Sequence, residues 1–230
     1  MKKEINQDKK IKKIVALAVF AALAYVIHFV HIPVGFLNLD FKDVIITVSA
    51  MYFGPLSGIV LSVFVPVLEF ITVSETGPYG LIMNILSSVT FVGTASLIYR
   101  FKKTLSGAVA GLCAAVFSMT AVMILANMFI TPYYMGVARS EVVALIPTLL
   151  LPFNAIKAVL NASLTLCLYK PITKVLRRSG FGKSTTNAPT ESVAGDTRLR
   201  TTLVWVIGGL ITISALIVIF AVLGGKIAFN

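Results

Sequence analysis

Long apolar segments with almost no charge follow one another along this chain, and they constrain its fold more than any other feature. A helix needs about 20 apolar residues to cross the roughly 30 Å hydrocarbon core of a bilayer. The chain is 57% hydrophobic and 13% charged, whereas soluble domains are about 45–50% apolar and about 25% charged. The segments therefore predict an all-α integral membrane protein that crosses a lipid membrane several times.

Seven helical segments are expected. They cover residues 14–30, 44–53, 56–73, 81–99, 105–130, 148–176 and 203–223. The second segment is too short to cross a bilayer alone. Either it is a short helix beside a polar loop, which is a common way to open a pocket from one face, or it continues through Gly54 and Pro55. The sequence leaves both alternatives open.

The composition also predicts how the chain divides. Residues 1–178 are expected to form a six-helix membrane domain. Residues 179–200 are rich in Ser, Thr, Gly and Asn with almost no large apolar side chains, which is typical of a flexible linker. Residues 201–230 are expected to form an additional C-terminal transmembrane helix and a short tail.

The basic residues predict the orientation in the membrane. The chain has 20 Lys and Arg against 9 Asp and Glu, a formal net charge of +11. The basic residues gather at the N-terminus, at residues 100–103 and at residues 170–183. Alternating spans bring all three clusters to one side, and clusters of Lys and Arg mark the cytoplasmic side. We therefore expect a cytoplasmic N-terminus and linker, with the loop that carries Asp40 and Asp43 outside.

Several kinds of site are not expected. Cys113 and Cys167 lie inside apolar segments, which argues against a disulfide framework or a cysteine metal site. The basic residues stand at the ends of apolar segments rather than on a polar face, so nucleic-acid binding is not expected. Gly-Lys-Ser-Thr at 182–185 resembles the end of a phosphate-binding loop, but Arg177 occupies the position of its first glycine. We expect no metal, no cofactor and no catalytic residue.

Lys157 is the most informative residue, because it lies inside the sixth apolar segment. A charged side chain there costs about 2.5–3.5 kcal/mol on insertion scales and usually faces the interior of a bundle. Asn154 and Asn161 share its helical face. This stripe predicts a polar lining. The alternatives are that Lys157 extends to the membrane surface or that the asparagines only bind neighbouring helices.

Further polar residues lie in the expected outer halves of other spans. Asn84 is in the fourth segment, Asn127 and Thr131 are in the fifth, and Glu69 is near the end of the third. Each alone is typical of a hydrogen bond between helices. Together, among aromatic residues such as Tyr79, they predict a cavity that opens outward and suits a planar aromatic ligand.

The first span carries a pair of small residues at helical spacing, Ala18 and Ala22. Small residues allow another helix to approach closely in lipid. The pair either packs inside the bundle or forms a face that meets a partner protein, and the first span is the best candidate for such a face.

Five motifs in order resemble a known family. They are Asn-Leu-Asp-Phe-Lys-Asp at 38–43, Tyr-Phe-Gly-Pro-Leu-Ser-Gly at 52–58, Gly-Leu-Ile-Met-Asn at 80–84, Asn127 with Ile-Thr-Pro-Tyr-Tyr-Met-Gly at 130–136, and Leu-Pro-Phe-Asn-Ala-Ile-Lys at 151–157. Over roughly residues 10–178 the chain resembles the riboflavin-specific S components of energy-coupling factor (ECF) transporters. Phe-Gly-Pro recurs among S components for several vitamins, whereas the combination with Pro-Phe-Asn-x-x-Lys is more specific to the riboflavin branch.

The resemblance implies a function and a set of contacts. It implies a multi-pass subunit of a bacterial cell membrane that captures riboflavin, or its phosphate FMN, from outside. The subunit would dock on a transmembrane coupling subunit with two ATPases, through the face of Ala18 and Ala22. The implied ligand contacts are Asn84, Asn127, Asn154 and Lys157, with Leu39, Phe41 and Met83 near the flavin ring. The seventh segment departs from the six helices of that family.

Three other functions stay open at this point. One is an S component for a different vitamin. Another is an integral membrane enzyme that uses Glu69 and Lys157, although no paired carboxylates, metal cluster or activated nucleophile is visible. The third is a secondary transporter, which usually shows broken helices and ion-coupling acids in both halves.

Overall fold

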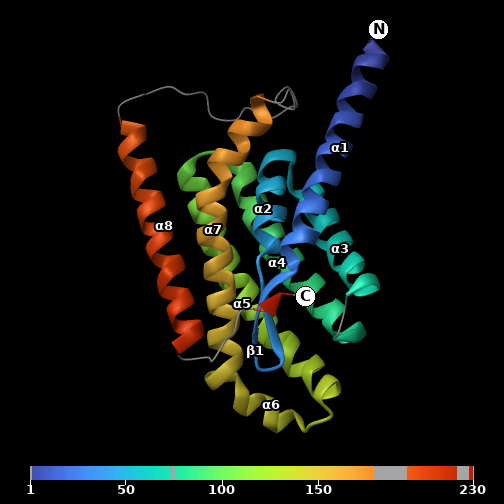
Figure 1. Ribbon diagram of the computed structural model, residues 1–230, viewed down its shortest axis with the longest axis vertical. Helices are drawn as coiled ribbons and strands as arrows, with labels where there is room; N and C mark the ends of the chain where they lie inside the picture. The colour runs from blue at the N-terminus through green and yellow to red at the C-terminus, as the bar shows by residue number, and fades with distance from the viewer. Residues whose placement is uncertain (1, 74–75, 179–195, 222–227, 230) are drawn as a thin grey trace.

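The computed structural model describes residues 2–73, 76–178, 196–221 and 228–229, and they are mostly helical (Figure 1). The elements in chain order are α1 (Lys2–His28), β1 (Val30–Val34), β2 (Leu37–Asp40), α2 (Lys42–Phe53), α3 (Pro55–Thr72), α4 (Gly77–Phe101), α5 (Leu105–Met135), α6 (Arg139–Leu145), the π-helical turn η1 (Ile146–Leu150), α7 (Leu151–Arg178), α8 (Asp196–Ala221) and β3 (Ala228–Phe229).

Five helical segments of the described chain are long and apolar enough to cross a membrane. They are Lys10–His28, Pro55–Thr72, Gly77–Phe101, Leu105–Met135 and Arg139–Leu176, the last of which combines α6, η1 and α7. The apolar part of α8, Val206–Ile219, is shorter. The prediction of a helical protein with several apolar helices is confirmed at this level. Of the linker expected at 179–200, residues 179–195 lie outside the described residues. Residues 196–200 belong to α8, which begins at Asp196.

The short second segment is a separate helix. It forms α2, whose residues from Lys42 to Met51 are all buried. Gly54 ends it with a φ of 104°, a left-handed conformation that glycine adopts without a steric penalty. Pro55 then begins α3, a position where its missing N–H costs nothing. Of the two alternatives left by the sequence, the structure has the short helix, enclosed by α1, α3, α4 and α7.

The segment between α1 and α2, expected as a polar loop, is a β-hairpin, so the fold is mostly helical rather than helical throughout. In the register of β1 and β2, His31 lies opposite Asp40 and Ile32 lies opposite Leu39. Because side chains alternate across a strand, Leu39 lies on the apolar face of the hairpin and Asp40 on its polar face. Gly35, with a φ of 61°, makes the turn between the strands.

The two ends of the molecule differ. The N-terminus of α1 and the C-terminal end of α7 lie at one end, at the top of Figure 1, while the hairpin and α6 lie at the opposite end. The main apolar core connects these ends through α1–α5 and α7, with fully buried side chains such as Ile46, Phe91 and Leu112. α8 packs along α7 on the outside of this bundle (Figure 1).

Candidate ligand-binding site

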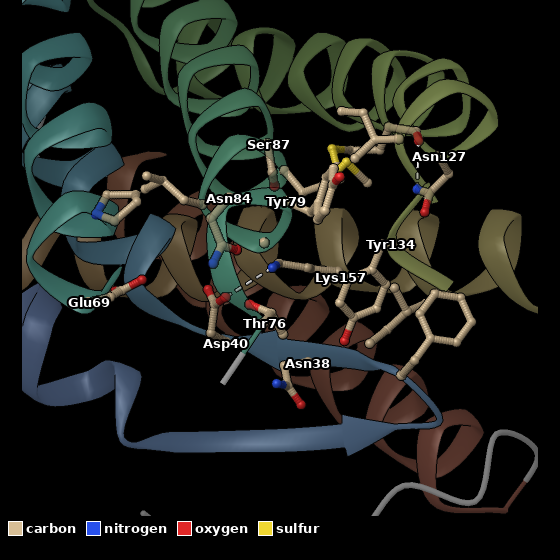
Figure 2. Close-up of a pocket in the computed structure, with 18 of the residues that line it drawn as sticks. Asn38, Asp40, Glu69, Thr76, Tyr79, Asn84, Ser87, Asn127, Tyr134 and Lys157 are labelled. Atoms are coloured by element: carbon tan, nitrogen blue, oxygen red, sulfur yellow. Dashed lines mark hydrogen bonds and ion pairs between the residues drawn. The ribbon is translucent and has the colours of Figure 1, made fainter. Parts of the chain in front are cut away.

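A pocket lies at the hairpin end of the bundle (Figure 2). It contains about 1130 Å³ of empty space, its open mouth included. Its walls come from the end of α1, the hairpin, α3, α4, α5 and α7. The site therefore depends on helices that are far apart in the sequence and on the hairpin that closes one side.

The lining combines aromatic and apolar walls with a small polar set. The apolar part includes Phe36, Tyr79, Met83, Tyr134 and Phe153. The polar part includes Asn38, Asp40, Glu69, Asn84, Ser87, Asn127, Thr131, Asn154 and Lys157. Figure 2 shows Asp40, Asn84 and Lys157 close together, with Asn127 farther across the cavity. Apolar walls with a few placed polar groups are characteristic of sites for small organic ligands.

Five of the seven ligand contacts expected from the sequence line this pocket, namely Met83, Asn84, Asn127, Asn154 and Lys157. The other two lie outside its lining. Leu39 is 1% exposed and belongs to a second apolar cluster behind the hairpin, and Phe41 packs against that cluster. The alternation of β2 is the reason, since Asn38 and Asp40 face the pocket and Leu39 between them faces away.

Two asparagines of the pocket, Asn127 on α5 and Asn154 on α7, are held by hydrogen bonds to neighbouring turns. Asn127 donates from Nδ2 to the carbonyl oxygen of Met123 at 2.7 Å, and its Oδ1 accepts from Thr131 at 2.8 Å. Asn154 donates from Nδ2 to the carbonyl oxygen of Leu150 at 2.7 Å. These bonds fix each amide before a ligand binds, so that less side-chain entropy is lost on binding.

Asn161, expected on the same polar stripe, is placed differently. It is fully buried but does not line the pocket. Neither its Oδ1 nor its Nδ2 has a hydrogen-bond partner among the described residues. The polar stripe predicted on the sixth span is thus divided, with Asn154 and Lys157 in the site and Asn161 one turn farther along α7.

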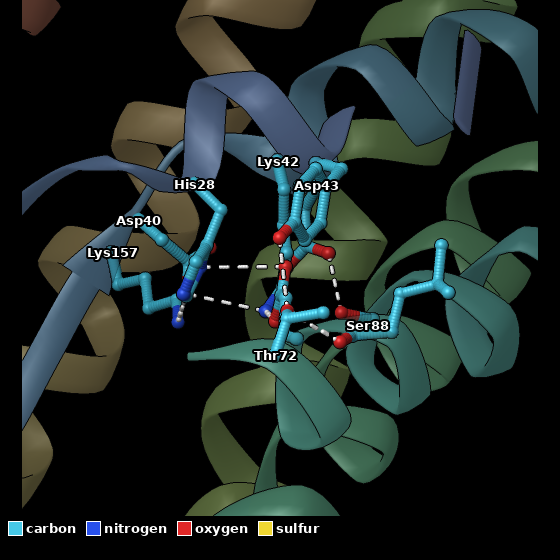
Figure 3. A network of polar contacts seen from close by, with 10 residues as sticks. His28, Asp40, Lys42, Asp43, Thr72, Ser88 and Lys157 are labelled. Atoms are coloured by element: carbon cyan, nitrogen blue, oxygen red, sulfur yellow. Dashed lines mark hydrogen bonds and ion pairs between the residues drawn. The ribbon is translucent and has the colours of Figure 1, made fainter. Parts of the chain in front are cut away.

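A buried ion network forms the floor of the pocket (Figure 3). It consists of the buried Asp40, Lys42, Glu69 and Lys157, with the partly exposed imidazole of His28 beside Glu69. Lys157 Nζ donates to Asp40 Oδ2 at 3.0 Å, and Lys42 Nζ is 3.7 Å from the same oxygen. Lys42 also donates to Glu69, whose second oxygen is 3.3 Å from His28 Nδ1. Beside the network, Ser88 donates to the buried Asp43 at 2.5 Å. Since buried ions are costly unless paired, these contacts explain how so many charged groups lie in an apolar end of the molecule.

Asp40 stands at the centre of this network. Burial raises the pKa of its carboxyl, but the positive charges of Lys157 and Lys42 outweigh burial and hold the pKa below its ordinary value. The carboxyl is therefore ionised at neutral pH, and it supplies a fixed negative partner for the Lys157 ammonium. An arriving ligand meets an ammonium whose position is already set by the hairpin.

The sequence identified Lys157 and Glu69 but missed the roles of Asp40 and Lys42, which were expected in a polar outer loop. The signal was present in Leu-Asn-Leu-Asp at 37–40, where apolar and polar residues alternate as in a half-buried strand. The pairing of Asp40 with Lys157, 117 residues apart, depends on the tertiary fold and carries no local pattern.

The small-residue pair on α1 lies away from the bundle. Ala18 and Ala22 are exposed, whereas Ala16, Ala21 and Ala24 are buried against the core. The first alternative, that the pair packs inside the bundle, does not hold among the described residues. The pair remains accessible to lipid or to a partner.

Comparison with known proteins agrees with this architecture. The family described as "ECF transporter, substrate-specific component" matches residues 12–169. The riboflavin transporter RibU of Staphylococcus aureus (strain TCH60) is 27% identical over 187 residues, which cover 77% of this chain and 98% of that protein. The riboflavin transporter FmnP of Bacillus subtilis (strain 168) is 24% identical over 163 residues, which cover 65% of this chain and 86% of that protein.

A solved structure extends the likeness to the fold. The structure described as that of the S component of a bacterial ECF transporter superposes with a TM-score of 0.64 at 28% identity, and it covers 74% of this chain and 99% of that chain. The family match runs from α1 into α7 and ends before α8. Because this match spans well over half of the sequence, the chain belongs to the substrate-specific components of ECF transporters.

Proposed function

We propose that this chain binds riboflavin in the pocket at the hairpin end and delivers it for uptake into the cell. The chain is a multi-pass membrane protein and a substrate-binding subunit rather than an enzyme, as its family indicates. Two of its relatives are riboflavin transporters. The observation that carries the proposal is the combination of aromatic walls with Asn84, Asn127, Asn154 and Lys157 in one pocket.

The chemistry of a flavin suits this lining. The isoalloxazine ring is flat and apolar on both faces, while one edge carries carbonyl oxygens and an N–H group. In our proposal Lys157 and Asn84 donate to the carbonyl oxygens, and Asn127 and Asn154 contribute amide groups to the same ring or to the ribityl chain. Met83 contacts the face of the ring. Leu39 and Phe41 act from behind the hairpin by supporting the strand that carries Asp40.

We further propose the orientation expected from the charges. The basic N-terminus and the basic end of α7 lie together at one end in Figure 1, and basic clusters favour the cytoplasmic side. The pocket at the opposite end then faces outward. In this arrangement residues 1–178 form the six-helix binding domain, residues 179–195 are a cytoplasmic linker, shorter than the expected 179–200 because α8 begins at Asp196, and α8 is the additional seventh helix.

ECF substrate-specific components work with a transmembrane coupling subunit and two ATPase subunits. We propose that the exposed face of α1 around Ala18 and Ala22 meets the coupling subunit. Its support is that these small residues point away from the bundle, where another helix can approach closely in lipid.

Equilibrium titration of the purified protein tests the proposed ligand. Flavin-free protein in detergent is mixed with riboflavin, FMN, thiamine or biotin, and binding is followed by quenching of flavin fluorescence or by calorimetry. Riboflavin is expected to bind at submicromolar concentration and thiamine and biotin not at all, while FMN reports whether a phosphate is tolerated. Failure to bind riboflavin at micromolar concentration, or tighter binding of another vitamin, would refute the proposal.

A further inference from the structure

The seventh helix lies outside the family match, yet it makes specific contacts with the binding domain. Along α7, Thr212 of α8 shares a hydrogen bond of 2.7 Å with Ser163. One turn away, a Cβ atom at Gly208 would lie 3.0 Å from Cys167 Sγ, so the glycine allows the two helices to approach closely. These contacts fix α8 against α7 rather than leaving it as a separate anchor in lipid.

The last turns of α8 belong to the apolar cluster behind the hairpin. Ala215 and Ile219 are 9% and 0% exposed, and they join an apolar cluster with Ile32, Val34 and Leu39 of the hairpin. The cluster also contains Phe153 and Leu160 of α7. The opposite side of α8 is open, since Ile213 and Ile217 are 56% and 59% exposed. The helix thus has one face in the apolar cluster that it shares with α7 and the hairpin, and one face outside that cluster.

A second contact joins the C-terminal tail to the hairpin. β3 pairs antiparallel with β1, with Val30 opposite Phe229 and His31 opposite Ala228, and the sheet has the order β2-β1-β3. β3 therefore covers an edge of β1 whose backbone groups would otherwise lack strand partners. The hairpin is held at its apolar face by α8 and at its free edge by β3.

The other face of this hairpin is a wall of the pocket. Asn38 and Asp40 line the cavity, and Leu39 between them is buried against the cluster that contains Ile219. A movement of Leu39 away from the cluster therefore carries Asp40 away from Lys157. We propose that α8 and β3 hold the hairpin against the binding domain, so that Ile219 acts through Leu39 to position the pocket wall and to slow the release of bound ligand.

The retention of ligand rests on the proposed function, whereas the support of the hairpin does not. The test therefore needs one readout with ligand and one without. Ile219→Ala removes most of the buried side chain, and Ile219→Val removes a single methylene group. Ile217→Ala is the matched control, because the same side chain is shortened on the exposed face of the same helix.

Without ligand, amide hydrogen exchange of the peptide covering residues 30–40 is measured by mass spectrometry. We expect exchange roughly tenfold faster in Ile219→Ala, because the apolar contacts of a buried residue are lost, a smaller increase in Ile219→Val, and no change in Ile217→Ala. Equal hairpin exchange in all four proteins overturns the proposal whether or not any of them binds riboflavin.

With ligand, riboflavin release is followed by stopped-flow fluorescence. The dissociation rate is expected to rise several-fold in Ile219→Ala at a nearly unchanged association rate, with the midpoint of thermal unfolding of the ligand-free helices preserved. A rate equal to that of Ile217→Ala overturns the positioning role. If wild type itself does not bind riboflavin, the proposed function fails, and hairpin exchange still decides the role of α8.

Discussion

Lys157 and Asp40 show how a few charged residues define this site. Both are buried, and their ion pair of 3.0 Å connects α7 to the hairpin. Buried pairs rarely contribute much to stability compared with apolar residues of the same size. Their presence at the floor of a pocket is better explained by the ligand, which gains a charged donor that is already in position.

Replacing Lys157 separates binding from stability. Lys157→Ala removes a charged hydrogen-bond donor worth about 1.5–3 kcal/mol, so we expect the Kd for riboflavin to rise roughly 10- to 100-fold. It also leaves Asp40 with less compensating charge in a buried place, so the midpoint of thermal unfolding should fall. Fluorescence titration and thermal unfolding measure the two effects on the same preparation.

The double variant Asp40→Asn with Lys157→Met is the control for this experiment. It removes the Asp40 carboxylate together with the Lys157 ammonium, so neither charge of the pair is left without the other. We expect it to regain much of the lost stability without regaining affinity. Unchanged affinity of Lys157→Ala would remove this residue from the ligand contacts.

Asn154 and Asn161 provide a matched pair on α7. Asn154 lines the pocket, whereas Asn161 is buried away from it and its amide has no partner among the described residues. Asn154→Ala is expected to weaken riboflavin binding by roughly 2- to 10-fold, the usual range for a neutral hydrogen bond. Asn161→Ala should leave the Kd unchanged and should not lower the thermal midpoint, because no hydrogen bond is lost. Equal effects of both variants on the Kd would contradict the assigned pocket.

At the scale of elements, α1 has one buried face and one exposed face. Ala16, Ala21 and Ala24 pack into the bundle, and Ala18 and Ala22 face outward. An outward face of small residues inside an apolar helix suits contact with another membrane helix. The hairpin that follows α1 belongs to the pocket, so the proposed docking face and the pocket lie on neighbouring elements that can be tested separately.

Bulky residues on the outer face of α1 should block uptake but preserve binding. In Ala18→Trp and Ala22→Trp, we expect riboflavin uptake by cells that contain the complete transporter to fall to background, because the coupling subunit can no longer approach. The Kd of the purified variants should equal that of wild type. Leu56→Trp, on an exposed position of α3, is the control and should retain uptake. Loss of binding in the α1 variants would contradict the assigned interface.

Particular elements show what the sequence could predict. The apolar helices followed from segment length, and Asn84, Asn127, Asn154 and Lys157 were found because polar residues are rare in the spans. Met83 was implied only by the family resemblance, and all five line the pocket. The hairpin was missed because its strands have five and four residues and lie in a stretch rich in turn-forming residues. Pairing of Asp40 with Lys157 and of α8 with the hairpin depends on contacts between distant segments, which no local pattern records.

At the scale of the whole molecule, the clusters of basic residues and the pocket lie at opposite ends. The basic N-terminus and the C-terminal end of α7 are at one end and the pocket is at the other (Figure 1). This polarity suits a protein that receives its ligand on one side of a membrane and engages energy-supplying subunits on the other. It also makes the orientation testable independently of the ligand.

Cysteine labelling of intact cells tests the orientation. In a background where Cys113 and Cys167 are replaced by alanine, a single cysteine is introduced either at Tyr133, which is 76% exposed near the end of α5, or at Lys10. We expect a membrane-impermeant maleimide to label the cysteine at position 133 in intact cells and the one at position 10 only after lysis. The reverse pattern would place the pocket on the cytoplasmic side.

The flavin content of the purified protein tests the central claim most directly. The chain is purified in detergent from flavin-containing cells and denatured, and the released flavin is identified by chromatography and quantified against protein. We predict about one riboflavin per wild-type chain and almost none in the Asn154→Ala, Lys157→Ala double variant purified in the same way. A wild-type protein that is folded but free of flavin, and that takes up none when riboflavin is added, would contradict the account.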